Sequence, residues 1–521
     1  MHSEPPAQAG TGLCPRGLAI GELLDSPARI RWAAAIDAGR RRELPADEAR
    51  REIVNAAGGR QMVVFLDGTL PCEQILAADA ACRVWPGAKL CVLIDPAERE
   101  LLLGTESSGA EYLADADLAA CDAFLIVGDA FAANPACSRG VFESRAANPR
   151  VPIATIDPGA GSAGKFASIP VATPPGGELA ALAAVARAAG LDAPEAAAPA
   201  GLDESAARSA GAALAKAKRP AVIFAAEFGR GGAWRQIGCL GGKLAAGLGG
   251  GVACQTHGAN ALAAVRLEPR LETIGLADAL GRRDEKWIVI GCDVLGLLGI
   301  TNRPILAAGA ALPNRTTEAA KFVLPTALAA ELDGTYLLGN RLVRVAAAAP
   351  PPAGVPAPAD LVAALARAAG ANAPAETADV GELARRTVDA PKPAPTPTPP
   401  AEGAVLLLGR CAADAGCGEL TSHATFQSSV GATPTLRLAA GNARKLGLKN
   451  LDMARVRSGG ASLQARVLVS PSLGPAVAVL PESLPDARAM CPCQRNGDDE
   501  VAFLPAAATI EAVHDYASQE T

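Results

Sequence analysis

Long apolar runs alternate with helix-like stretches through the first part of the chain. The runs "QMVVFLDG" (61–68), "AKLCVLID" (88–95), "CDAFLIVGD" (121–129) and "VPIATIDPG" (151–159) are nearly continuous in apolar residues and end in polar or glycine-containing turns. Strands that are apolar on both faces and separated by helices are typical of a parallel sheet covered on both sides. The pattern predicts a first α/β lobe, which we place at residues 46–200.

A second series of the same kind follows. The stretch "GLDESAARSAGAALAKAKRP" (201–220) predicts a helix that begins near Asp203, and "AVIFAAEFG" (221–229) predicts the strand after it. A glycine-rich helical stretch comes next, and "KWIVIGCDVLG" (286–296) is a further strand that ends in a loop. We therefore expect a second α/β lobe over residues 201–370.

The character of the chain changes after the second lobe. Residues 371–402 contain "APKPAPTPTPP", which is typical of a semi-rigid, solvated polyproline linker. Short strands with glycine turns follow, as in "ARVRSGGASLQARVLVSPSLGPAVAVLP" (454–481), and they predict a small β-barrel at residues 403–505. The last stretch, residues 506–521, predicts a terminal helix. The expected fold class is thus α/β, with two doubly wound parallel-sheet lobes and a C-terminal barrel.

Composition narrows the class of protein. The chain has 521 residues, a net charge of -6 and 3% aromatic residues. Acidic and basic residues are interspersed, which argues against nucleic-acid binding, because that function requires a basic stripe. No run of about 18 apolar residues predicts a membrane span, and the opening "MHSEPPAQAG" lacks the pattern of a secretory signal. We expect a cytoplasmic protein that meets a membrane only through a larger complex.

The chain has 13 cysteines, an odd number, and most lie within apolar runs. They indicate reduced thiols rather than a disulfide framework. We interpret Cys72, Cys82, Cys91, Cys121 and Cys292 as small buried hydrophobic residues. The close pair Cys491 and Cys493 has no second pair at metal-binding spacing, so we interpret it as structural, with a redox or metal-binding role as the alternative.

Three stretches together carry a resemblance to a known family. The first, "AKFVLPTALAAELDGTYLLGNRLVRV" (320–345), joins a strand that ends in Leu-Pro to Glu331, an Asp-Gly-Thr triplet and an Asn-Arg pair. The second is "LRLAAGNARKLGLKNLDMARVRSGG" in the barrel (436–460). The third combines "LCPRG" around Cys14 with "DSPARIRW" (25–32). In this order they resemble the molybdopterin oxidoreductase family, whose barrel contains an "NPxDAxxLGIxDGDxVxVxSxxG" run.

The chain departs from that family where the metals bind. An iron–sulfur cluster needs four thiolates, yet no cysteine precedes Cys14. We interpret residues 1–45 as a remnant of the iron–sulfur domain and Cys14 as a lone remnant of its motif, with a ligand shared with another subunit as the alternative. The residue that binds molybdenum in catalytic members is expected on a loop near residues 95–121. Ser107 or Ser108 could take its place there, but no neighbouring histidine or arginine supports the chemistry.

The resemblance also implies a cleft that binds a pterin dinucleotide. Loops after parallel strands bind phosphates because helix N-termini and glycine amides face the ligand. Here Asp129 and Asp293 stand where the family prefers Asn, and a carboxylate that faces a pyrophosphate is repulsive. We expect a vestigial cleft without bound cofactor, whose candidate residues are Gly128, Asp129, Asp157, Gly176, Gly177, Gly291, His257 and His423.

Two functions follow from the resemblance. The first is a scaffold subunit of an electron-transfer oxidoreductase complex, similar to the large peripheral-arm subunit of respiratory complex I, with iron–sulfur proteins as its partners. The second is a catalytic subunit similar to formate or formylmethanofuran dehydrogenases, which would bind molybdopterin guanine dinucleotide. A free-standing α/β protein with a relic fold is a third possibility. We expect the scaffold subunit, without catalytic residues or metal of its own.

Overall fold

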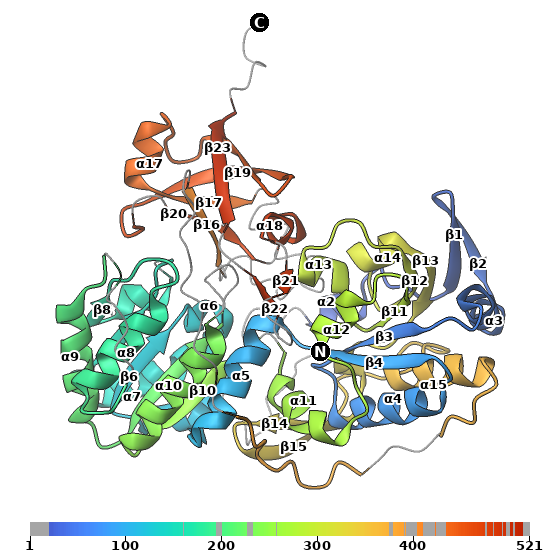
Figure 1. Cartoon of the computed structure of the whole chain (residues 1–521), viewed down its shortest axis with the longest axis horizontal. Helices are drawn as coiled ribbons and strands as arrows, with labels where there is room; N and C mark the ends of the chain where they lie inside the picture. The colour runs from blue at the N-terminus through green and yellow to red at the C-terminus, as the bar shows by residue number, and fades with distance from the viewer. Residues whose placement is uncertain are drawn as a thin grey trace, which may run out of the picture.

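Two α/β lobes and a barrel build the molecule (Figure 1). The computed structural model describes residues 20–159, 161–193, 199, 201–226, 233–256, 258–374, 379–389, 391, 404–409, 423, 434–474, 477–482, 484–491, 493–495, 501–503 and 506–513. In Figure 1 the barrel lies above the two lobes. Within the residues described, no helix combines the length and the apolar character that crossing a bilayer requires.

The first sheet has seven strands and draws on distant parts of the sequence. Its order is β2 (Arg40–Leu44), β1 (Ala33–Asp37), β13 (Ala320–Pro325), β12 (Ile305–Ala310), β11 (Lys286–Ile290), β3 (Met62–Asp67) and β4 (Ala88–Leu93). Strands β13 through β4 pair in parallel, whereas the β1–β2 hairpin joins antiparallel to β13. The helices that follow or cover these strands are α2 (Ile20–Leu24), α3 (Ala46–Ala57), α4 (Cys72–Val84), α12 (Leu276–Gly281), α13 (Val294–Leu298), α14 (Arg315–Ala319) and α15 (Pro358–Ala368).

The second sheet has six parallel strands. Its order is β5 (Glu111–Tyr112), β10 (Gly251–Gln255), β9 (Pro220–Ala225), β6 (Ala123–Val127), β7 (Ile153–Ile156) and β8 (Ile169–Val171). Its helices are α5 (Pro96–Ser108), α6 (Ala130–Ala133), α7 (Pro135–Ala147), α8 (Glu178–Ala188), α9 (Glu204–Ala215), α10 (Trp234–Gly247) and α11 (Ala261–Leu267). Asp203 caps α9 through the backbone amide of Ala206, as the sequence predicted.

The two lobes are therefore interleaved, which corrects the expected contiguous division into residues 46–200 and 201–370. Strands from 62–93 pair with strands from 286–325, and strands from 123–156 pair with strands from 220–255. Parallel strands need only a crossover connection between them, so their neighbours in the sheet can lie far away in sequence. The hairpin at 33–44, expected in the remnant domain, belongs to the first sheet.

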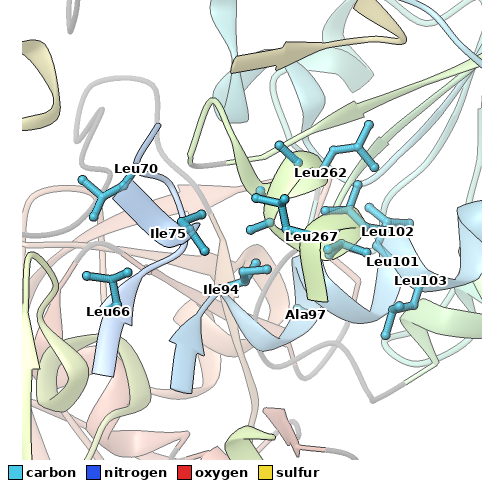
Figure 2. Close-up of a cluster of buried hydrophobic side chains, with 14 of the residues drawn as sticks. Leu66, Leu70, Ile75, Ile94, Ala97, Leu101, Leu102, Leu103, Leu262 and Leu267 are labelled. Carbon is cyan, nitrogen blue, oxygen red and sulfur yellow. The ribbon is translucent and has the colours of Figure 1, made fainter. Parts of the chain in front are cut away.

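One apolar cluster holds the lobes together. Leu101 and Leu102 of α5 face Leu262 and Leu267 of α11, and the same cluster continues to Ile75 of α4 (Figure 2). Helix α5 also packs tightly on α10, because a Cβ atom added to Gly104 would lie 1.9 Å from the Arg235 carbonyl oxygen. The lobe interface is thus a continuous core rather than a hinge between separate domains.

The C-terminal part forms a closed barrel, as predicted. Its strand order is β16 (Ala404–Gly409), β20 (Val477–Pro481), β17 (Thr435–Ala439), β19 (Ala461–Ser470), β18 (Met453–Ser458) and β23 (Ala506–Ala512). The other elements here are α17 (Ala440–Lys445), α18 (Pro485–Met490) and the hairpin of β21 (Cys493–Arg495) and β22 (Val501–Phe503). The expected helix at 506–521 is wrong for residues 506–512, because their alternating apolar residues complete the barrel as β23.

The barrel and the first lobe share one buried cluster. It joins Phe65 and Trp287 of the first sheet to Leu436 and Leu480 of the barrel. Buried Arg488 of α18 donates from Nη1 to the Leu297 carbonyl oxygen of α13 at 2.8 Å. The barrel is therefore packed firmly on the first lobe.

The remaining elements are short. Strands β14 (Gly334–Leu338) and β15 (Arg341–Val345) form a hairpin, and 3₁₀ helices span Asp115–Ala120, Ala163–Phe166, Glu268–Arg270 and Ala329–Glu331. Part of the predicted linker, residues 379–389, lies against the lobes instead of being fully solvated. There Arg385 donates to the Ala110 carbonyl oxygen at 2.6 Å, and the Arg386 amide donates to Glu106 at 2.6 Å.

Candidate functional site

The loops at the carboxyl ends of the parallel strands are where this fold class places ligands. In the second sheet, β6 runs into Gly128 and Asp129, and β7 runs into Asp157. These two strands are neighbours, so the two carboxylates come together at one edge. A Cβ atom added to Gly161 would lie 2.4 Å from both Asp129 Cγ and Asp157 Oδ2, so only glycine can lie this close to the pair.

Both carboxylates accept hydrogen bonds from the loop itself. Asp129 accepts from the Ser162 amide at 2.8 Å, from the Ser162 hydroxyl at 2.7 Å and from the Ala132 amide at 3.3 Å. Asp157 accepts from the amides of Gly159 and Gly161 at 2.7 and 2.6 Å. These amides are the donors that would otherwise face a bound phosphate. The chain's own side chains therefore occupy this anion-binding position.

Burial governs the charge of this pair. Asp129 is almost fully buried, and desolvation together with the neighbouring Asp157 raises the pKa of its carboxyl group. The hydrogen bonds from Ser162 and the charge of Arg437 in β17 act in the opposite direction. The positive charge of Arg437, on a strand of the barrel, thus acts on a carboxyl group of the second lobe.

The first sheet repeats the arrangement. Asp293, after β11, accepts from the Gly296 amide at 3.1 Å, the Thr316 amide at 3.0 Å and the Thr316 hydroxyl at 2.7 Å. It caps α13 and at the same time ties that helix to α14. The amides at this second edge are also bound to a carboxylate of the chain.

The other predicted residues are spread over the molecule. Gly176, with φ of 80°, and Gly177 form the turn before α8, where a Cβ atom on Gly177 would lie 2.5 Å from Thr173 Oγ1. Gly128 (φ 83°) and Gly291 (φ 79°) end β6 and β11 in left-handed turns. His423 approaches the Pro313 carbonyl oxygen in the first lobe at 2.9 Å. His257 and Cys14 lie outside the described residues.

The region predicted to carry a molybdenum ligand is not a loop. Residues 96–108 form α5, and the hydroxyl groups of Ser107 and Ser108 donate to the carbonyl oxygens of Gly104 and Thr105 within that helix. Most residues of α5 are buried, and a buried segment satisfies its backbone hydrogen-bonding groups as a helix rather than as an open loop. In the part of the chain that the structure describes, no group of three or more His, Cys, Asp or Glu side chains is placed to hold a metal ion.

The thiols behave as buried hydrophobic groups. Cys72, Cys82, Cys91 and Cys121 are buried, as predicted, and Cys292 is half-buried. Burial raises the pKa of the Cys91 and Cys491 thiols to about 12 and raises that of Cys493 as well. Since the thiolate is the reactive form, the structural interpretation of Cys491 and Cys493 is favoured.

Sequence reasoning missed Asp67. It ends β3, accepts from the Thr69 amide at 2.8 Å and from the Thr69 hydroxyl at 3.0 Å, and lies next to Gly291, whose added Cβ would be 3.5 Å from Asp67 Cβ. Desolvation raises the pKa of this carboxyl group to about 6. A carboxylate directly after a buried parallel strand was the available signal, but local sequence cannot give its degree of burial.

The residues that carry the family resemblance make structural contacts. Buried Arg29, from "DSPARIRW", donates from Nη2 to Glu331 at 2.5 Å. The Thr335 amide and hydroxyl donate to Glu73 at 2.8 and 2.6 Å, and Arg266 donates to Asn340 at 3.2 Å. These motif residues join distant segments of the lobes to each other.

A molybdopterin dinucleotide does not fit these loops as they stand. Its pyrophosphate would meet the carboxylates of Asp129, Asp157 and Asp293, and the neighbouring amides already have acceptors. Displacing a carboxylate would leave a buried charge without its hydrogen bonds.

Comparisons with known proteins address the fold. No family model matches the sequence, and no curated protein sequence matches it. Among solved structures, acetylene hydratase from Pelobacter acetylenicus superposes with a TM-score of 0.67 at 11% identity, covering 97% of this chain and 96% of the hydratase. The formyltransferase/hydrolase complex (FhcABCD) from Methylorubrum extorquens in complex with methylofuran gives a TM-score of 0.47 at 16% identity, over 64% of this chain and 98% of the matched chain. The chain therefore has the fold of the molybdopterin oxidoreductases.

Proposed function

We propose that this chain is a scaffold subunit of a multisubunit electron-transfer oxidoreductase, comparable to the large peripheral-arm subunit of respiratory complex I. In this role it positions iron–sulfur-carrying partner proteins and performs no molybdenum chemistry itself.

One observation carries the proposal. The loop amides at both carboxyl edges donate to Asp129, Asp157 and Asp293 instead of remaining available to a phosphate. A cofactor site must keep such donors free or cover them with water that leaves on binding. Loops that satisfy themselves internally gain stability and give up ligand affinity, which is expected of a scaffold.

The motif residues support the same role. Glu331, Thr335 and Asn340, which carry the resemblance, make buried or half-buried contacts to Arg29, Glu73 and Arg266. These contacts stabilise the junctions between segments and need no cofactor.

Metal and pterin content test the proposal. The full chain, purified from cells supplied with molybdate and tungstate, is expected to contain less than about one tenth of an equivalent of molybdenum, tungsten or pterin, because the amides of Gly161, Ser162 and Thr316 already donate to carboxylates of the chain. Metals are measured by mass spectrometry, and pterin is measured by the fluorescence of its oxidised form. Near-stoichiometric metal together with pterin would overturn the scaffold role.

In the catalytic alternative, Asp67 is the candidate general acid or base. A carboxyl group with a pKa near neutrality at the carboxyl edge of a parallel sheet is suited to general acid–base chemistry. If the chain is a formate- or formylmethanofuran-dehydrogenase-like subunit, Asp67→Asn abolishes turnover of the metal-loaded complex. If the chain is a scaffold, the same substitution leaves the activity of the assembled complex unchanged.

A further inference from the structure

Exposed leucines and cations gather on one part of the barrel. Among the described residues, Leu446, Leu451 and Leu468 are 39%, 70% and 44% exposed. Lys445, Lys449 and Arg466 are exposed between them. We call these six residues the barrel loop face: Lys445, Leu446, Lys449, Leu451, Arg466 and Leu468.

Backbone contacts bring the two segments of the barrel loop face together. The Leu451 amide donates to the Val467 carbonyl oxygen at 2.8 Å, and Asn450 Oδ1 accepts from the Val469 amide at 2.6 Å. These bonds hold the loop that follows α17 directly against β19, on which Arg466 and Leu468 point away from the barrel interior. The loop and the exposed side of β19 thus lie side by side.

The charge of this surface is opposite to that of the chain. Residues 434–474 contain seven Lys or Arg residues and one Asp, whereas the whole chain has 48 basic and 54 acidic residues. Lys445, Lys449 and Arg466 form no ion pair with any acidic side chain in the described part of the molecule. A partner with acidic groups would therefore find uncompensated cations here.

Leu451 is held in a conformation that favours glycine. Its φ is 74°, in the left-handed region that glycine adopts without a steric penalty. A left-handed residue with a side chain costs free energy, and an exposed leucine recovers none of it by burial within the chain. The strain is offset if a partner buries the side chain.

We propose that the barrel loop face is the docking surface for a partner protein subunit whose own surface is acidic around an apolar centre. The inference rests on the proposed function, since it assumes that the chain works within a complex. The leucines provide the apolar contact, and the cations provide a charged rim that selects the partner.

The composition of the face favours a protein over other anionic partners. Membrane-surface sites usually include Trp or Tyr at the headgroup level, and none of the six residues is aromatic. Nucleic-acid sites extend a basic stripe along phosphates and do not bury leucines at the centre. A protein with carboxylates around an apolar patch can contact the leucines with its apolar patch and the cations with its carboxylates.

Photo-crosslinking identifies the partner. A photoreactive amino acid is placed at position 451 of the full chain in its native cells, and at position 342 as a control, because Leu342 is 41% exposed on a different element. The expected result is cross-linked peptides of one protein from position 451, with Asp or Glu beside apolar residues, and none from position 342. Lipid, nucleic acid, a second copy of this chain or no cross-link at position 451 would each overturn the proposal.

Substitutions at Leu451 then separate binding from folding. Leu451→Ala and Leu451→Gly are expected to weaken the affinity for the purified cross-linked partner by about ten- to thirty-fold, because each removes a buried apolar contact. Leu451→Gly also relieves the left-handed strain, so its unfolding temperature stays equal to or rises above that of the parent. Unchanged affinity in both variants would contradict the inference, whatever their stability.

Charge reversal gives a second, independent measurement. Lys445→Glu with Lys449→Glu is expected to weaken partner binding by roughly ten-fold at low salt and by less at high salt. The matched control reverses Lys216 and Lys218, which are exposed after α9, and should leave binding unchanged. If the complex forms and its affinity is the same for every variant, this inference is wrong and the scaffold role is unaffected. Stoichiometric metal and pterin would instead overturn the scaffold role.

Discussion

The carboxyl edges of the two lobes differ from the barrel loop face in where their polar groups find partners. At the edges, Asp129, Asp157 and Asp293 accept the hydrogen bonds of their own loops. On the barrel, cations and leucines remain exposed, and Leu451 keeps a strained backbone. The strand-end loops of the lobes thus use their polar groups internally, whereas the barrel loop face presents cations and leucines to solvent. This contrast is the basis for our proposal that a partner docks on the barrel.

The largest effect is expected where a buried contact joins distant segments. Arg29→Met leaves Glu331 buried without its cation and should lower the free energy of unfolding by about 3–5 kcal/mol. The control Arg42→Met removes an exposed pair with Glu52 and should cost no more than about 1 kcal/mol. Chemical denaturation measures the free energy of unfolding of both variants. Equal losses would contradict the expectation that the buried ion pair matters more than the exposed one.

A second test compares one polar side chain from each region. Asp293→Ala removes the acceptor of three hydrogen bonds and should cost about 2–3 kcal/mol of unfolding free energy. Asn450→Ala removes one exposed acceptor in the barrel and should cost about 1 kcal/mol. A larger loss of unfolding free energy for Asn450→Ala than for Asp293→Ala would contradict the view that the loops of the lobes are the ones held by internal hydrogen bonds.

Asp67 adds a dependence on pH. Its folded pKa of about 6 lies above the ordinary value of an aspartate, so the folded state binds this proton more tightly than the unfolded state. The stabilising contribution of the protonated carboxyl group is present below the unfolded pKa and is lost as the pH rises through the folded pKa. Asp67→Asn should therefore raise the free energy of unfolding by about 1–2 kcal/mol at pH 7.5 and leave it unchanged near pH 3. Denaturation at several pH values checks this, and a difference independent of pH would contradict it.

The smallest effect concerns a second left-handed residue. Ala38 (φ 48°) and Gly39 (φ 77°) form the two-residue turn between β1 and β2, where Asn-Gly is the preferred pair. Ala38→Asn should raise the free energy of unfolding by about 0.5 kcal/mol, as measured by thermal and chemical denaturation. It is also the matched control for Leu451→Gly, because it relieves strain outside the barrel loop face and should leave partner binding unchanged.

Much of the architecture could be predicted because it depends on local patterns. The apolar runs at 61–68 and 121–129 became β3 and β6, and the glycine turns of the C-terminal part became a barrel. The helix expected at 506–521 is wrong for residues 506–512, because a short stretch of mixed propensity takes the structure that its neighbours favour, and here it pairs with β16 and β18.

The candidate site was predicted only in part. Gly128, Asp129, Asp157 and Gly291 do follow parallel strands, as the turn residues indicated. The sequence could not show that Asp129 and Asp157 meet beneath Gly161, or that Asp67 loses solvent next to Gly291, because both depend on which strands become neighbours.

Outside residues 506–512, the sequence by itself indicated the kinds of the main elements in the lobes and the barrel, since the period of apolar residues distinguishes helix from strand within a short stretch of chain. Only the tertiary structure decided how the lobes interleave, which carboxylates take up the loop amides and which leucines remain exposed. These outcomes depend on contacts between residues hundreds of positions apart, such as Arg29 with Glu331, and a contact of that range leaves no periodic trace in the sequence.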